Sequence, residues 1–286
     1  MYIDLSCMKS GFCDRLRQIT FCIAYNKLKK KNNKIIKIFE IKTKECPYYF
    51  TELMELKGLR AFNLKRKKIK NQDIKMDPFN SSISFETCEK YNTDNLDNLK
   101  LLEEWKNTYK ILRPKKKFKK KIDKISKKNL ACIHSRITDK HLSFLGFLLE
   151  IPNKDVIFSY QINDFYKNVF NFIPKKIKNI YISSDDEFSR NKLIRNLEKN
   201  FKIIGDKPTF KKNKLRQTSG EQFIIDLFVM SKCNFLISST GGNVPLTATL
   251  MSDRKILYLK WTKTRDIYKI INFLRNFIYE LRKIFR

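Results

Sequence analysis

Residues that can bind a polar or anionic ligand follow three apolar runs in the second half of the sequence. They are His134 and Arg136 in CIHSR, Asp185 and Asp186 in YISSDD, and Gly241 and Gly242 in FLISSTGGN. An arginine fork pairs with two oxygens of a diphosphate, and backbone N–H groups at a helix start bind the same anion. Carboxylates accept hydrogen bonds from a guanine edge or from ribose hydroxyls. Together these residue types suit a purine nucleoside diphosphate.

The elements that must hold these residues alternate between strands and helices. LACIHS, NIYISSDD, FKIIG, NFLISST and KILYLK are typical of strands, whereas EFSRNKLIRNLEKN and SGEQFIIDLFVMSKC are typical of helices. YIDLS, DRLRQITFCIAYNKLKK and KIIKIFEI predict an earlier strand, helix and strand, and residues 43–100 predict loops and short helices. This is the pattern of parallel sheets with covering helices, in which ligands bind beyond the carboxyl ends of the strands. We expect an α/β fold with two units joined near residues 105–128 and facing a cleft.

Composition excludes several classes of protein. With 286 residues, of which 42% are hydrophobic, the chain can bury one large core or two ordinary ones. It contains neither a long apolar run nor a secretory signal pattern, so a cytoplasmic protein is expected. Its 7 cysteines lack CxxC pairs and a nearby group of histidines, which indicates reduced, mostly buried thiols rather than disulfides or a zinc site.

The formal net charge of +32 favours polyanions such as nucleic acid or anionic lipid. The lysines are spread over the whole chain, which favours a general compositional bias over a dedicated binding surface. In RPKKKFKKKIDKISKK, residues 113–128, Phe118, Ile122 and Ile125 fall on one helical face. This spacing predicts a lysine-coated surface helix. Because no nucleic-acid-binding motif accompanies it, a nucleic-acid-binding function rests on charge alone.

Four stretches, taken in order, resemble the α-1,6-fucosyltransferase family. HSRITDK resembles the family motif HVRRTDK, and YISSDD is similar to its strand before paired aspartates. FIIDLFVMSKCNFLISSTGGNV is similar to the family segment DIHFLSQADFLVCTFSSQV, and CMKSGFCDRLRQITFCIAY is similar to its glycine turn and first helix. The resemblance covers roughly residues 5–40 and 110–252.

The resemblance implies a GT-B-like fold of two Rossmann-like units, GDP-fucose as donor, inversion at the sugar carbon, and neither metal nor cofactor. It assigns donor-binding roles to these residues: Gly11, His134, Arg136, Asp139, Lys140, Asp185, Asp186, Asp226, Gly241 and Gly242. Within this set Arg136 holds the β-phosphate, Lys140 contacts the diphosphate and Asp226 reads the guanine. Structural alternatives stay open: a helix-surface charge for Asp226, a satisfied strand-end imidazole for His134, and a helix N-cap for Asp185 and Asp186.

The sequence departs from the family in several places. Ile137 stands where the family has a second arginine, Gly241 and Gly242 replace two serines, and Gly11 is the one glycine left in the first turn. Phe144 stands where the resemblance implies a catalytic glutamate. KDVIFS resembles the family segment TEAAFH, which makes Asp155 the candidate base after an insertion, with Glu150 in reserve.

The resulting hypothesis has residues 1–112 as an acceptor-side domain and 113–262 as the donor domain. Residues 263–286 form a basic amphipathic helix that packs on the sheet or docks on the inner face of an anionic membrane. The expected function is fucose transfer from GDP-fucose to a carbohydrate acceptor, such as a surface glycan, with no nucleic-acid partner. The alternatives are a basic nucleic-acid-binding protein and a degenerate transferase that binds GDP without turnover.

Overall fold

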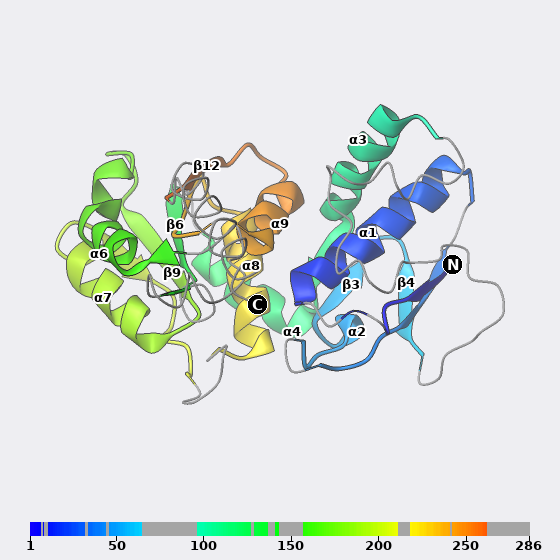
Figure 1. Ribbon diagram of the computed structural model, residues 1–286, viewed down its shortest axis with the longest axis horizontal. Coiled ribbons are helices and arrows are strands. Elements are labelled where there is room, and N and C mark those ends of the chain that lie inside the picture. Colours follow the sequence, from blue (N-terminus) through cyan, green and yellow to red (C-terminus); the bar gives the residue numbers. More distant parts are fainter. Residues whose placement is uncertain are drawn as a thin grey trace, which may run out of the picture. The chain divides into compact units, whose positions relative to one another are not determined.

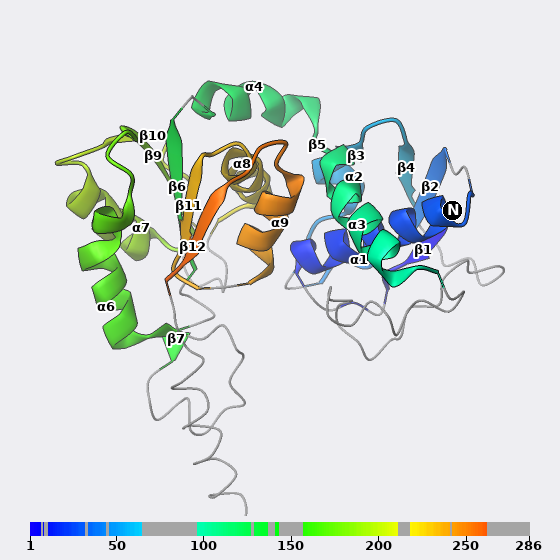
Figure 2. The same ribbon diagram turned by 90° about the horizontal axis from the view of Figure 1, so that it is seen from above.

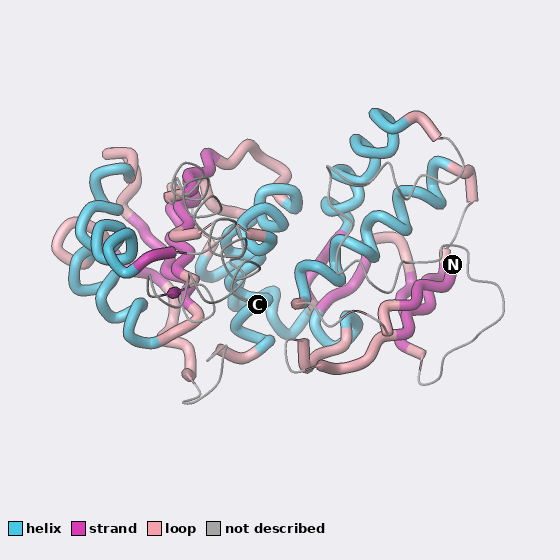
Figure 3. The backbone as a smooth tube through the Cα atoms, viewed as in Figure 1, coloured by secondary structure: helices cyan, strands magenta, loops and turns pink. Residues whose placement is uncertain are grey.

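Helices and strands alternate along the chain, as Figure 3 shows for the computed structural model. The structure describes residues 1–6, 8, 11–31, 34–43, 46–64, 96–126, 129–136, 141–142, 157–210, 218–240 and 242–261. It divides into two units. Unit 1 is Met1–Lys124, Gly220–Lys232 and Leu246–Arg254, and unit 2 is Ile125–Ser219, Cys233–Pro245 and Lys255–Arg286. The boundaries expected after residues 112 and 262 stay predictions, as does the role of residues 263–286, which lie outside the described ranges.

Unit 1 is built on a parallel sheet of three strands in the order β1-β2-β4. The strands are β1 (Tyr2–Asp4), β2 (Ile35–Phe39) and β4 (Arg60–Asn63). In β2 the side chains alternate, with Ile36 and Ile38 fully buried between exposed neighbours. Alternation of this kind marks a strand with one face on the core and one face toward solvent.

Helix α1 (Phe12–Leu28) lies beside α3 (Asn98–Thr108) in both views of the ribbon (Figures 1 and 2). The indole N–H of Trp105 donates to the Thr20 hydroxyl at 3.0 Å, and the Trp105 ring meets Phe21 edge-on at 5.1 Å. Both aromatic side chains are fully buried. The α1–α3 contact is therefore a packed interface with its one indole donor satisfied.

Several short elements complete unit 1. These are α2 (Phe50–Leu53), an antiparallel pair of β3 (Met54–Leu56) with β5 (Leu112–Pro114), the 3-10 helix η2 (Tyr109–Ile111) and α4 (Lys116–Ile125). Helix α8 (Gly220–Ser231) and most of α9 (Asn243–Met251) also belong to this unit. In α4 the predicted apolar face is confirmed, because Phe118, Ile122 and Ile125 are buried while most of its lysines are exposed.

Unit 2 is built on a parallel sheet of five strands in the order β10-β9-β6-β11-β12. They are β6 (Leu130–Ser135), β9 (Asn179–Ser184), β10 (Lys202–Ile204), β11 (Phe235–Ser238) and β12 (Leu257–Lys260). Every residue of β6 is buried, which is typical of a central strand with both faces covered. A second, two-stranded sheet joins β7 (His141–Leu142) to β8 (Ile157–Phe158).

Helices α6 (Ser159–Asn168) and α7 (Glu187–Leu197) lie on the same side of the five-stranded sheet (Figure 2). The 3-10 helix η3 (Val169–Phe172) extends α6. Phe165 and Val169 are fully buried in a cluster with Ile133 and Ile180 of the sheet. This core packs α6 and η3 against strands β6 and β9.

The predicted class, mixed α/β with parallel sheets, is confirmed. The predicted buried thiols are confirmed where the structure describes them, since five cysteines are free and buried: Cys13, Cys22, Cys46, Cys132 and Cys233. Burial raises the pKa of Cys22 to about 12, which keeps this thiol protonated. Among the helices that the structure describes, none has both the length and the apolar character needed to cross a bilayer.

Candidate active site at the carboxyl edge of the unit 2 sheet

Three neighbouring strands of unit 2 end in polar residues at the same edge of the sheet. The register places His134 of β6 opposite Ser183 of β9 on one side and Ser238 of β11 on the other. Because all three strands are parallel, the residues that follow them also meet at this edge. The structure thus brings together the segments that the sequence predicted to form a site.

Hydrogen bonds connect the three strand ends. The Ser239 N–H donates to the His134 carbonyl at 2.9 Å, and the Arg136 N–H donates to the Ser239 hydroxyl at 3.0 Å. On the other side, the Asp185 N–H donates to the Ser135 carbonyl at 3.2 Å. The backbone at Arg136 and Asp185 is thereby held from neighbouring strands, which is the kind of support that positions a binding side chain.

His134 is buried, with 6% of its surface exposed. Its Nδ1 atom lies 3.2 Å from the Ser183 hydroxyl, within hydrogen-bond distance. This geometry matches the satisfied strand-end imidazole that the sequence left open as an alternative. A donor-binding role for His134 stays a prediction.

Arg136 and Asp185 are the partly exposed charges of this edge. Arg136 is the first residue after β6, and Asp185 is the first after β9. A guanidinium and a carboxylate on adjacent parallel strands can bind the anionic and the hydroxyl-bearing parts of one ligand. Both positions are compatible with the donor-binding roles predicted for these residues.

Asp186 has a structural role. It is the N-cap of α7, and its Oδ1 atom accepts a hydrogen bond from the Ser189 N–H at 2.8 Å. Its backbone N–H lies 3.3 Å from the Ser184 hydroxyl, which in turn donates to the Asp186 carbonyl at 2.9 Å. The alternative left open for the aspartate pair is therefore realised for Asp186, and only Asp185 remains partly exposed.

Sequence reasoning did not single out Tyr166 of α6. Its hydroxyl donates to the Ser189 hydroxyl at 2.7 Å, directly behind the capped first turn of α7. Burial is the main cause that raises the pKa of Tyr166 to about 12, and the nearby Asp186 charge adds to it. Among the twelve tyrosines, no local pattern marks this one, because its partner is 23 residues away.

The third strand end leads into a helix. The Ser238 hydroxyl donates to the Thr240 carbonyl, and Gly242 adopts φ 123° before α9 begins at Asn243. Side chains rarely tolerate this backbone conformation, so glycine is the residue that fits here. The turn directs the first N–H groups of a helix out of the strand end, which is a suitable arrangement for binding an anion.

Gly11 and Asp226 belong to unit 1. Gly11 is the N-cap of α1 with φ −68°, a conformation open to any residue. Asp226 lies on α8, is 6% exposed, and accepts a hydrogen bond from the Gln222 amide at 2.6 Å. The alternative of an exposed surface charge for Asp226 is therefore wrong. The donor-binding roles of Gly11 and Asp226 stay predictions.

Five predicted site residues lie outside the described ranges: Asp139, Lys140, Glu150, Asp155 and Gly241. Ile137 and Phe144, at which the sequence departs from the family pattern, lie outside them as well. In the described ranges, no three His, Cys, Asp or Glu side chains gather as metal ligands do. The expectation of a reaction without metal or cofactor stays a prediction.

Comparison with known proteins supports the fold. No protein-family model matches the chain, and no curated protein matches it in sequence. Among solved structures, it is similar to NodZ α-1,6-fucosyltransferase soaked with GDP-fucose, at 12% identity and a TM-score of 0.50, over 90% of this chain and 94% of that one. It is similar to POFUT1 in its apo form at 12% identity and a TM-score of 0.51, over 90% of this chain and 97% of that one. The resemblance to the α-1,6-fucosyltransferases is thus confirmed at the level of the fold.

Proposed function

We propose that this protein is a glycosyltransferase that transfers fucose from GDP-fucose to a carbohydrate acceptor. One observation carries the proposal: Arg136, Asp185 and the start of α9 meet at the carboxyl edge of a parallel sheet, in a chain with the fold of a fucosyltransferase. The proposed fold has two Rossmann-like units, and we place the donor diphosphate at the strand ends of unit 2. The donor complex in NodZ supports this choice of nucleotide sugar.

Binding of the donor depends on charge. GDP carries a diphosphate, and the Arg136 guanidinium can hold two of its oxygens at once. The N–H groups at the start of α9 add donors for the same phosphates. In the transition state the leaving GDP gains negative charge, so donors fixed before the reaction stabilise it without reorganisation. Asp139 and Lys140 follow Arg136 by three and four residues, and they complete the donor-binding group in our proposal.

Nucleotide choice is assigned to Asp226. Its Oδ1 atom is occupied by the Gln222 amide, so Gln222 fixes the orientation of the carboxylate. A carboxylate accepts two hydrogen bonds from the N1–H and 2-amino groups of guanine, and neither adenine nor uracil offers this pair. A base that lacks this pair of donors loses both hydrogen bonds, so the carboxylate discriminates between nucleotides.

Attack on the sugar is inverting in this proposal. The acceptor hydroxyl displaces GDP from the opposite face of the sugar, and a carboxylate accepts the hydroxyl proton as the new bond forms. Asp155 is the first candidate for this base and Glu150 the second. Because Phe144 occupies the position of the family's glutamate, a protein that binds GDP without turnover is the second candidate function.

Nucleotide-dependent thermal shifts test the proposal. GDP and GDP-fucose are expected to raise the melting temperature more than UDP, CMP or ADP, with and without EDTA, because a bound ligand stabilises the folded state. Equal shifts for all nucleotides would mean that only phosphates are recognised. Salt-sensitive retention on DNA or RNA without any GDP shift would instead identify a nucleic-acid-binding protein. A GDP shift without transfer to any acceptor would identify the degenerate transferase.

The acceptor and the cellular site belong to the same proposal. A surface glycan built in the cytoplasm at the inner membrane face is the acceptor we favour, because GDP-sugars and lipid-linked glycans meet there. Vesicle flotation with anionic lipids, with and without residues 263–286, tests the proposed membrane contact of this basic segment. Flotation that does not change when the segment is removed would exclude that role.

A further inference from the structure

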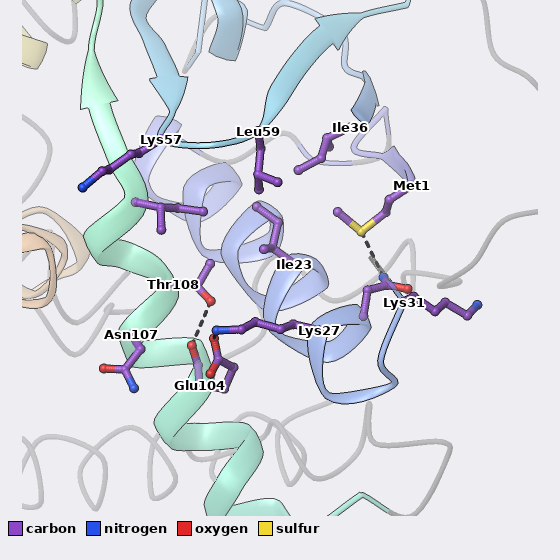
Figure 4. A pocket seen from close by; sticks show the side chains of 12 residues that line it. Met1, Ile23, Lys27, Lys31, Ile36, Lys57, Leu59, Glu104, Asn107 and Thr108 are labelled. Atoms are coloured by element: carbon purple, nitrogen blue, oxygen red, sulfur yellow. Dashed lines mark hydrogen bonds and ion pairs between the residues drawn. The ribbon is translucent and has the colours of Figure 1, made fainter. Parts of the chain in front are cut away.

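Unit 1 contains a cavity of about 310 Å³ at the edge of its sheet where the strands begin (Figure 4). Met1 and Ile36 line it from the amino ends of β1 and β2, and Leu59 lines it from the residue before β4. Ligands of parallel sheets bind beyond the carboxyl ends. The cavity therefore lies at the edge away from the place where substrates of parallel sheets bind.

The walls of the cavity differ in polarity. Figure 4 shows Ile23, Ile36 and Leu59 grouped on one side. On the other side the Lys27 ammonium pairs with Glu104 at 2.7 Å, and the Thr108 hydroxyl donates to the Glu104 carbonyl at 2.8 Å. A ligand with an apolar part and a polar end fits such walls.

The charge of the lining determines the sign of the polar end. Lys27, Lys31 and Lys57 line the cavity against a single carboxylate, that of Glu104. Lys27 already engages this carboxylate, so the lining keeps an excess of positive charge. The Lys57 ammonium points away from the cavity in Figure 4, and its four-carbon side chain allows it to turn toward a bound anion.

We propose that this cavity binds a small amphipathic anion, a short aliphatic chain that carries one carboxylate. The chain packs on Ile23, Ile36 and Leu59, and the carboxylate pairs with the Lys57 ammonium. The volume is at the lower end of the range of small-molecule sites, about 300 Å³, which limits the chain to a short one.

Titration calorimetry with octanoate tests the site, with acetate and octanol as matched probes. Octanoate is expected to bind at one site per chain, octanol at least tenfold more weakly because it lacks the charge, and acetate not measurably because it lacks the chain. Saturating GDP should leave octanoate binding unchanged, since none of the residues proposed to bind GDP lines the cavity. Absence of octanoate binding to the wild-type protein, or displacement of octanoate by GDP, would overturn the proposal.

Variants locate the site. Lys57→Glu should weaken octanoate binding by roughly tenfold. Lys110→Glu makes the same charge change at an exposed residue of η2 that does not line the cavity, and it should retain wild-type affinity. Leu59→Trp should fill the apolar side and abolish binding, whereas GDP binding by both Leu59→Trp and Lys57→Glu stays unchanged. Equal losses in Lys57→Glu and Lys110→Glu would show that octanoate responds to overall charge and would refute this cavity as the site.

Discussion

The Asp186 carboxylate accepts a hydrogen bond from the Ser189 N–H at 2.8 Å and so caps the first turn of α7. Asp185, one residue earlier, is the partly exposed member of the pair. Asp186→Ala is expected to lower the free energy of unfolding by about 1 kcal/mol, the usual value of an N-cap, and Asp186→Asn by less, because asparagine also caps. Urea unfolding followed by circular dichroism measures both. Asp253→Ala, at an exposed position after α9, is the matched control and should leave stability nearly unchanged; a loss equal to that of Asp186→Ala would contradict the assignment.

Two glycines with positive φ allow the cost of backbone strain to be measured apart from the cost of steric crowding. Gly205 has φ +93°, and a Cβ atom there would lie 2.7 Å from the ring of Tyr181, which is buried. Gly58 has φ +79° with no atom within 4 Å of its Cβ position. Gly58→Ala should cost about 1–2 kcal/mol of stability through strain alone. Gly205→Ala should cost a further 1–3 kcal/mol, roughly, because the ring must move. Equal losses in chemical denaturation would mean that Tyr181 gives way freely.

Tyr166 makes stability depend on pH in the alkaline range. Its pKa is raised to about 12 in the folded protein, mainly by burial, against about 10 for an unfolded tyrosine. The folded state therefore keeps a proton between pH 10 and 12 that the unfolded state has lost, so this contribution to stability is complete below pH 10 and declines as pH rises through that window. Tyr166→Phe should lose about 1 kcal/mol at neutral pH with its bond to Ser189, and should lack this part of the decline. Unfolding of both proteins from pH 8 to 12 measures the difference, and parallel curves would refute the assignment.

The sequence predicted the features that repeat with a local period. The face of α4 formed by Phe118, Ile122 and Ile125 is buried, and the apolar runs before His134 and Asp185 are strands of one parallel sheet. Each of these patterns lies within about ten residues, so propensity and hydrophobic spacing are sufficient to detect it.

Long-range relationships were not predictable. The pairing of β3 with β5 joins three-residue strands that are far apart in the sequence, and short runs of this kind carry no period. The same limit applies to Tyr166, whose link to Ser189 depends on how α6 packs beside α7. At the site, residue types predicted the chemistry, but only the structure separates Asp186, which caps a helix, from Asp185, which does not.

Arg136 tests the donor site. If the Arg136 guanidinium holds the diphosphate, Arg136→Ala should abolish transfer and weaken GDP binding by roughly 2–4 kcal/mol. The melting temperature of the protein without ligand should change little. Arg136→Lys should restore little, because a point charge cannot reproduce two parallel hydrogen bonds. Arg195→Ala, at an exposed position of α7 in the same unit, removes the same charge away from the strand ends and serves as control. Full GDP affinity in Arg136→Ala would remove the donor-site assignment.

The catalytic base is the last point to test. A carboxylate that accepts the acceptor proton only in the transition state can be removed without loss of the donor, because the GDP contacts are made by other residues. Asp155→Asn should therefore leave GDP affinity nearly unchanged and lower turnover by roughly a hundredfold or more, the usual scale for loss of a general base. Glu150→Gln should be mild, and Asp164→Asn, at an exposed position of α6, should have no effect.

Transfer assays with GDP-fucose, run beside GDP titrations of the same three variants, distinguish the possible outcomes. A large loss of turnover in Glu150→Gln with a mild effect of Asp155→Asn would make Glu150 the base. The insertion after Lys140 would then be shorter than the alignment of KDVIFS with TEAAFH implies. Full turnover in both would mean that neither carboxylate accepts the proton. In that case an inverting mechanism with a single carboxylate base does not apply to this chain, because Phe144 leaves the family's own position without one.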